Sequence, residues 1–274
     1  SKDLREAAKG LSEREVRYLV DTFYQMQEIR IASRLQSLKI SEVGEPSSVF
    51  VWFEEQTMIL EKEIKKALES FVKAHPAGPW LLSLTGIGPI ISAGLLAHID
   101  IEKAPHVGHI YSFAGLAANQ KWEKGEKRPW NARLKVLCWK AGESFVKQSG
   151  RDSDIYGKLY YERKEREIRM NEAGVFRETA EAVLKAKKIG KTTDAYAAYS
   201  QGKLPPGHLH ARAKRFAVKI FLTHVHEVLF FLRWGKPAPP PYPIAHLGHV
   251  DKIPVPNTDF VPGWGARAPE TQPL

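Results

Sequence analysis

The sequence predicts an all-α protein made of a long helical hairpin, a compact multi-helix domain and an extended proline-rich C-terminal arm. Apolar residues recur at helical spacing along two long stretches near the start of the chain. No stretch shows the strict apolar–polar alternation of a half-buried strand. Prolines crowd the last forty residues. We therefore expect three parts, residues 1–78, 79–234 and 235–274.

The helical hairpin is predicted from two long periodic stretches. Ser12 followed by Glu15 is a capping-box pattern, and apolar positions then follow the helical period to about Lys39. Residues 41–46 break the pattern, and Ser47 or Ser48 would cap a second helix that runs to His75-Pro76. Two long helices joined by a short turn form an antiparallel hairpin.

Shorter helices are expected through the middle of the chain. Their approximate ranges are 79–84, 89–98, 106–116, 131–149, 153–171, 174–188 and 207–233. Asp152 or Ser153 is the expected N-cap of the helix that begins there. In residues 235–274 the proline density excludes regular secondary structure and favours extended chain. The aromatic and aliphatic residues of this arm predict that it lies along a surface of this or another subunit.

The charge balance points to an anionic partner. The chain has 274 residues and a net charge of +10, all of it within residues 1–234. Lys185–Lys219 holds nine bases and one acid, a net charge of +8. Because unpaired like charges repel, an external counter-charge such as nucleic acid is the favoured explanation. Lys121–Arg169 adds fourteen bases and eight acids, where pairing along a helix is an equally good explanation.

Several classes of protein are excluded by composition. Cys138 is the single cysteine, so no internal disulfide forms, and the charged start of the chain favours a cytoplasmic protein. Apolar runs are too short for a membrane span, which needs about 20 residues. No cofactor or bound metal is expected. His208 and His210 are too far along one helix from His224 and His226 for all four to hold one ion.

The motif that carries chemistry lies between Trp80 and His98. An apolar helix end is followed by Gly86-Ile87-Gly88 and by Pro89 at the start of a second helix, which is a helix-hairpin-helix pattern. Glycines let the backbone approach a phosphate, and the second helix presents its free N–H groups to it. Such contacts position a duplex without reading its sequence. The structural alternative is a tight turn in which Ile87 plugs the core.

A series of four segments resembles a known family. Leu84–Pro89, Gly94–Ile99, Ile110–Ala117 and Asn131–Leu137 resemble, in order and spacing, the carboxy-terminal domain of the Piv/MooV-type insertion-sequence transposases. This group includes the bridge-RNA-guided recombinases. The resemblance spans about residues 54–165, and it implies DNA binding, recombination and, as a further implication, a guide RNA.

Departures from the family pattern argue against catalysis. Family members resemble one another in an N-terminal RuvC-like domain with acidic metal ligands, which residues 1–53 are too few and too helical to form. The resemblance places the family's nucleophilic serine at Lys124, before Gly125, and Ala118 replaces the usual proline. Ser149, which also precedes a glycine, is another candidate nucleophile, but it lies too late in the sequence to match the family pattern. No catalytic residue is therefore assigned.

The expected nucleic-acid contacts combine the glycine turn with basic side chains. They are Thr85, Gly86, Ile87, Gly88, Lys121, Lys124, Lys127, Arg128, Arg133, Lys187, Lys188, Lys191, Arg212, Lys214 and Arg215. Trp122 and Trp130 flank the basic loop, and anchoring of that loop is favoured over stacking on a base.

Three functions remain open from the sequence. The favoured one is a non-catalytic nucleic-acid-binding protein of transposase-like origin that contacts phosphates, with DNA preferred to RNA. The second is a recombinase subunit that works with a separate catalytic partner. The third is an assembly protein of a mobile element or virus, in which the arm 236–274 clasps a neighbouring subunit.

Overall fold

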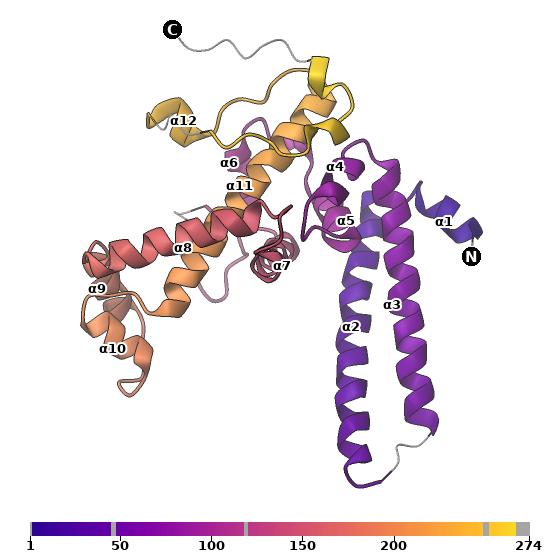
Figure 1. Ribbon diagram of the computed structural model, residues 1–274, viewed down its shortest axis with the longest axis horizontal. Coiled ribbons are helices and arrows are strands. Elements are labelled where there is room, and N and C mark those ends of the chain that lie inside the picture. The colour runs from indigo at the N-terminus through magenta and orange to yellow at the C-terminus, as the bar shows by residue number, and fades with distance from the viewer. Residues whose placement is uncertain (1, 45–47, 118–119, 249–251, 267–274) are drawn as a thin grey trace. The chain divides into compact units, whose positions relative to one another are not determined.

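The computed structural model describes residues 2–44, 48–117, 120–248 and 252–266, and all regular secondary structure within them is helical (Figure 1). This confirms the all-α prediction. Ser47 and Ala118, which the sequence analysis singled out, lie outside the described residues. Within the described residues, no helix combines the length and apolar character needed to cross a membrane.

The chain forms two compact units. The first combines Ser1–Ile110, His226–Pro240 and Asn257–Leu274, and the second combines Tyr111–Val225 and Pro241–Pro256. Helices α6 (Val107–Phe113) and α11 (Pro206–Trp234) each contribute residues to both units. The hairpin and the glycine turn belong to the same unit. The three-part division expected from the sequence stays a prediction about which parts fold on their own.

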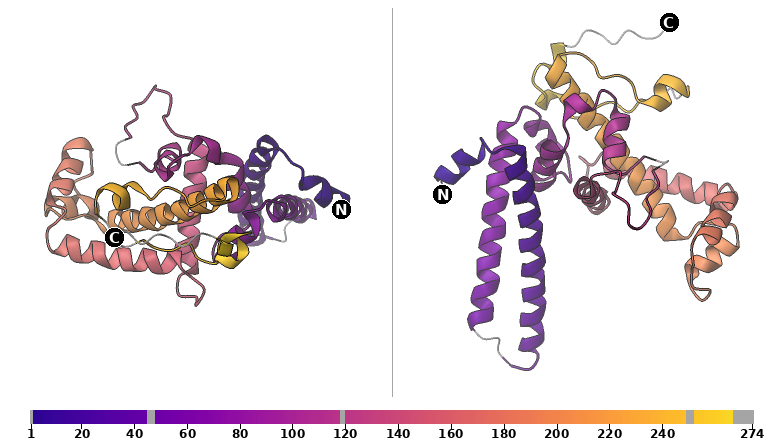
Figure 2. Two further views of the ribbon diagram at one scale, coloured as in Figure 1. Left: turned by 90° about the horizontal axis from the view of Figure 1, so that it is seen from above. Right: turned by 180° about the vertical axis from the view of Figure 1, so that it is seen from behind.

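The first unit is built on the expected hairpin of α2 (Glu13–Ser41) and α3 (Ser48–Ala74). The capping box is present, because Ser12 Oγ accepts from the Glu15 N–H and the Glu15 carboxylate accepts from the Ser12 N–H. Figures 1 and 2 show the two helices side by side. The short α1 (Lys2–Ala8) packs against α3.

At the inner end of the hairpin, α4 (Gly78–Ser83) and α5 (Pro89–His98) complete the core of the first unit. Helix α5 packs against both α2 and α3. A short 3₁₀ helix, η1 (Ile101–Lys103), follows. The buried side chains come from all four helices: Val16, Val20, Phe23, Leu68, Val72, Trp80, Leu81, Ala93 and Leu95. Burial of these apolar groups supplies most of the driving force for folding.

The second unit contains α7 (Ala132–Gln148), α8 (Tyr156–Glu172), α9 (Arg177–Ala186), α10 (Asp194–Ser200) and most of α11. Its core holds three packed rings, with the Phe221 centroid 5.4 Å from Phe145 and 5.3 Å from Tyr156. A smaller apolar cluster around Phe176 and Leu204 joins α9 and α10 to the start of α11.

Two local expectations are corrected. The N-cap of α8 is Ile155, not Asp152 or Ser153, and Oδ1 of the preceding Asp154 accepts from the Gly157 N–H at 2.8 Å. The proline-rich arm is also not wholly irregular. It forms α12 (Tyr242–His246) and two 3₁₀ turns, η2 (Thr258–Phe260) and η3 (Trp264–Ala266). Pro243 lies in the first turn of α12, where the missing N–H breaks no hydrogen bond, and the two 3₁₀ turns contain no proline.

The arm packs on its own chain at several points. In the first unit, Asn257 Nδ2 donates to the Ser83 carbonyl, and the Trp264 ring lies 5.0 Å from that of Phe231. In the second unit, the Ile253 carbonyl is 3.0 Å from Nε2 of His224. The arm therefore contributes to the packing of both units.

Candidate nucleic-acid interface

The turn between α4 and α5 has the local geometry that its glycines predict. Gly86 has a φ of 90°, in the region that favours glycine. Ile87 is buried, and its N–H donates to the Leu84 carbonyl, so its side chain packs into the core beneath the turn. The two interpretations of the turn are therefore compatible: Ile87 anchors it, and the backbone on either side remains at the surface.

The backbone of this turn is accessible to solvent at Gly88. It is exposed, it precedes Pro89 at the start of α5, and a Cβ placed on it would meet nothing within 4 Å. The N-cap of α5 is Gly88 itself, which has no side chain to cap the helix. An anionic group could therefore approach the first N–H groups of the helix without a steric barrier.

In the second unit, the loop of residues 120–131 is held by its two tryptophans. Trp122 Nε1 donates to the Glu126 carbonyl at 2.7 Å, and the edge of its ring faces Trp130. Asn131 closes the loop through its N–H, which donates to the Phe113 carbonyl, and through its side chain, which caps α7. The tryptophans thus anchor the loop, as the sequence analysis favoured.

Four cations from separate segments gather beside this loop, and we call them the basic cluster: Arg128, Lys135, Arg215 and Lys219. Burial lowers the pKa of Lys135, and the charges of Arg128 and Arg215 lower it further. Burial and the charge of Arg215 likewise lower the pKa of Lys219. The loop, α7 and α11 therefore bring like charges close enough to repel one another.

Aromatic rings support three of these cations. The Lys135 ammonium lies 4.0 Å from the centroid of Trp130, and the Lys219 ammonium lies 4.8 Å from that of Tyr111. The Arg128 guanidinium lies 5.1 Å from the Trp122 ring. The Tyr111 hydroxyl in turn donates to the Lys219 carbonyl, which fixes the ring against α11. Ring faces hold cations in place without neutralising their charge.

The basic cluster has no acidic counterpart at ion-pair distance among the described residues. Burial and the neighbouring Arg212 lower the pKa of Arg215, and only the more distant Glu167 opposes them. Concentrating positive charge in this way costs folding free energy unless an anion binds there. The cluster is therefore the strongest candidate for an anion-binding surface.

Two predicted contacts are instead compensated inside the protein. Lys214 is buried and pairs with Glu143, and it lies 5.2 Å from the Trp139 ring. Arg212 Nε donates to Glu167 at 2.7 Å. Acids from α7 and α8, distant in the sequence, thus neutralise part of the basic stretch that looked unpaired.

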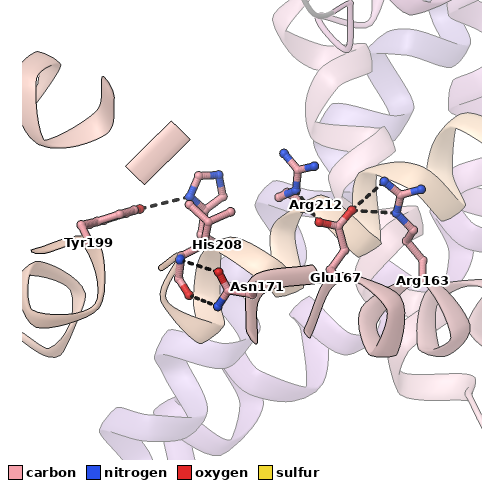
Figure 3. Close-up of polar contacts among 7 residues, drawn as sticks. Arg163, Glu167, Asn171, Tyr199, His208 and Arg212 are labelled. Atoms are coloured by element: carbon pink, nitrogen blue, oxygen red, sulfur yellow. Dashed lines mark hydrogen bonds and ion pairs between the residues drawn. The ribbon is translucent and has the colours of Figure 1, made fainter. Parts of the chain in front are cut away.

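Figure 3 shows the network that holds Arg212. Glu167 is fully buried and accepts from both Arg163 and Arg212. Burial favours the neutral form of Glu167, but the hydrogen bonds from the two guanidiniums outweigh burial and lower its pKa. On the same helix, Asn171 exchanges two hydrogen bonds with the backbone of Leu204. The network joins α8 to the start of α11 and so positions Arg215 on that helix.

The remaining basic candidates lie at the surface. Those in the loop and at the start of α7 are exposed, as are those between α9 and α10: Lys121, Lys124, Lys127, Arg133, Lys187, Lys188 and Lys191. Arg128 and Arg215 join the basic cluster. Thr85 and Gly86 are half-buried in the turn of the first unit.

Sequence reasoning missed Lys135 and Lys219 as site residues. Each looks like an ordinary helix lysine, and only the fold brings them to Arg215. One signal was present: Lys219 follows Arg212 and Arg215 at spacings of seven and four, which places the three on neighbouring positions of one helix face.

The histidines of α11 make hydrogen bonds with other groups of the protein. Nδ1 of His210 lies 2.7 Å from the Tyr160 hydroxyl, and Nδ1 of His208 lies 3.1 Å from that of Tyr199. His226 contacts the Ala104 carbonyl. Within the described residues, no group of three or more His, Cys, Asp or Glu side chains is arranged to hold a metal ion.

Ser149 follows the last residue of α7, and its Oγ donates to the Val146 carbonyl at 2.6 Å. The hydroxyl thus takes part in ending the helix. Lys124, at the position that the family resemblance gives to the nucleophile, is exposed in the loop.

Comparison of the chain with protein-family models, with curated proteins and with solved structures finds no match. The resemblance of residues 54–165 to the Piv/MooV-type transposases therefore stays a prediction.

Proposed function

We propose that this protein binds nucleic acid, preferentially duplex DNA, through phosphate contacts made by the basic cluster. The supporting observation is the convergence of Arg128, Lys135, Arg215 and Lys219 from three separate segments, without an acid at ion-pair distance among the described residues. Phosphates supply the missing counter-charge, and the displaced counterions favour binding.

The exposed lysines of the adjoining loop extend this surface. Lys121, Lys124 and Lys127 are exposed on the segment that the two tryptophans anchor. Lysines and arginines of this kind position a protein on a duplex without selecting a sequence. We therefore expect little sequence preference.

The turn at Gly88 is proposed as a second phosphate contact. It offers the backbone N–H groups of the first turn of α5 and an open approach at Gly88. Gly88→Val tests this contact without disturbing the fold, because a Cβ there meets nothing within 4 Å. Gly86 is a poorer choice for substitution, since its φ of 90° strains any other residue.

A salt titration of DNA affinity tests the proposal. The logarithm of the association constant should fall steeply with the logarithm of the salt concentration, and Arg215→Gln or Lys219→Gln should reduce this slope by about 1 each. Fluorescence anisotropy of a labelled duplex gives the affinity, and an RNA duplex of the same sequence gives the preference.

The matched control is Arg169→Gln on α8. Arg169 is exposed, lies near Glu165 and is not among the charges that act on the basic cluster. Its loss should leave the salt slope unchanged. Binding that does not respond to salt, or equal losses for Arg169→Gln and Arg215→Gln, would remove the proposal.

A further inference from the structure

The contact between α2 and α3 changes character along the hairpin. We call the facing positions of the two helices the seam. At its inner end the seam is apolar, with Val16, Val20 and Phe23 of α2 and Leu68 and Val72 of α3 all buried. The hairpin extends past α5 (Figure 1). Toward the turn between α2 and α3 the seam becomes polar.

Arg30 and Glu61 mark the polar part of the seam. Arg30 Nε donates to Glu61 at 2.6 Å across the two helices, and this hydrogen bond raises the pKa of Arg30. Thr57 is only 4% exposed. The hydroxyl oxygen of Ser37 is buried and has no hydrogen-bond partner among the described residues. Polar groups thus occupy positions that a self-sufficient hairpin fills with aliphatic side chains.

Apolar side chains instead cover the outside of the same half. We call residues 29–41 and 48–62 the hairpin tip. On α2, Ile31, Leu35 and Leu38 follow one face at spacings of four and three. The exposed apolar residues of the tip are Ile29, Ile31, Leu35, Leu38, Val49, Phe50, Val51, Trp52, Phe53, Met58, Ile59 and Leu60, each between 37% and 67% exposed.

We propose that the hairpin tip is the dimerisation surface of the protein, covered by the tip of a second copy to form a four-helix bundle. Fully covering an aromatic side chain buries about 150–250 Å². Phe50, Trp52 and Phe53 are about half exposed, so these three alone offer roughly 300 Å², and the nine other apolar side chains add to this area. A stable interface buries about 800 Å² on each partner. An exposed apolar patch of this size is unusual on a monomer.

Charge favours a second copy over an unrelated partner. Arg30 and Glu61 already pair within the seam. Of the other charges of the tip, the α2 part carries Arg34 and Lys39 and no acid, whereas the α3 part carries two acids, Glu54 and Glu55, and one base, Lys62. In a two-fold dimer each basic helix meets the acidic helix of the other copy. Arg34 and Glu55 are both exposed and lie equally far from the turn, seven residues from the adjacent helix end. Parallel tips therefore bring them together.

Sedimentation velocity of the full chain at micromolar concentration tests this proposal. The wild type should sediment as a dimer, and Leu35→Glu with Leu38→Glu should raise the dissociation constant about 100-fold or more. Both side chains are more than half exposed, so the variant should keep its fold, which circular dichroism checks. Tyr18→Glu is the matched control, because Tyr18 is 70% exposed on α2 outside the tip.

A charge exchange tests the pairing itself. Arg34→Glu should weaken the dimer by placing an acid opposite Glu55, and adding Glu55→Arg should restore it. A wild type that stays monomeric overturns the proposal. A monomer whose tip binds anionic lipid vesicles overturns it in favour of a membrane surface. Equal effects of Tyr18→Glu and of the two leucine substitutions also overturn it.

Discussion

The Tyr156 hydroxyl lies 2.8 Å from Nδ1 of His224 in the interior of the second unit, and Nε2 of the same ring lies 3.0 Å from the Ile253 carbonyl. A carbonyl only accepts, so Nε2 carries the proton and Nδ1 of the neutral ring accepts from Tyr156. The arrangement satisfies the neutral imidazole completely. A second ring proton, on Nδ1, would require the Tyr156 hydroxyl to turn its own proton away, and burial disfavours the charged ring.

Unfolding should therefore become easier in mild acid. Burial lowers the pKa of His224 from 6.5 to about 4, so the unfolded chain takes up a proton first. Stability is full above pH 6.5 and falls as the pH drops toward 4, by on the order of 3 kcal/mol for this residue. Urea unfolding at a series of pH values measures the loss.

His224→Gln should flatten that pH dependence. His98 in the first unit, whose pKa burial also lowers to about 4, should still titrate in the variant. An unchanged pH profile in His224→Gln would show that the ring does not titrate as its burial implies.

Glu167 should be among the most sensitive single positions of the second unit. Glu167→Ala leaves two guanidiniums without their shared carboxylate, and removing one partner from a buried ion pair costs about 3 kcal/mol. The free energy of unfolding from urea titration measures this loss. Glu165→Ala, an exposed carboxylate on the same helix, is the control and should change stability by less than about 0.5 kcal/mol.

Gly157→Ala should lower the stability of the protein, whereas alanine stabilises most helices in place of glycine. Alanine normally stabilises a helix interior by about 1 kcal/mol. At Gly157, however, a Cβ would lie 2.1 Å from Oδ2 of Asp154, the side chain that accepts from the Gly157 N–H. Thermal unfolding should show Gly157→Ala to be destabilised. Gly207→Ala in α11, where a Cβ meets nothing within 4 Å, should be neutral or stabilising.

Cys138 should report on opening of the second unit. The thiol is 2% exposed, and burial raises its pKa to about 12. Because only the thiolate reacts, labelling by a disulfide reagent should be slow in the folded protein and fast in denaturant. Labelling at the same rate in both states would contradict the buried position of this side chain.

Helix positions were predictable from the sequence because periodicity and capping are local. The hairpin, the Ser12 capping box and the short helices beside Gly86 all follow from residues within one or two turns of each other. The N-cap of α8 was misplaced because Asp152, Ser153 and Asp154 are all good capping residue types. In the structure the N-cap is Ile155, and Asp154 before it accepts from the Gly157 N–H.

Charge pairing was much less predictable, because ion-pair partners come from distant parts of the chain. The residues around Lys214 in the sequence offer no acidic partner, yet the fold brings Glu143 beside it. The same folding brings Lys135 to Arg215, which no local count could indicate. The basic cluster therefore depends on tertiary structure, whereas the glycine turn could be read from the sequence.

The packing of the arm also bears on the order of events during biosynthesis. Ile253 contacts His224, Asn257 contacts Ser83, and Trp264 contacts Phe231, so residues of the arm complete cores whose other residues are made earlier. The second unit cannot reach its final packing until Ile253 has left the ribosome, and the first unit cannot do so until Trp264 has. Until then the nascent chain exposes surface that the arm will later cover, which makes this interval the time at which a chaperone would be most useful.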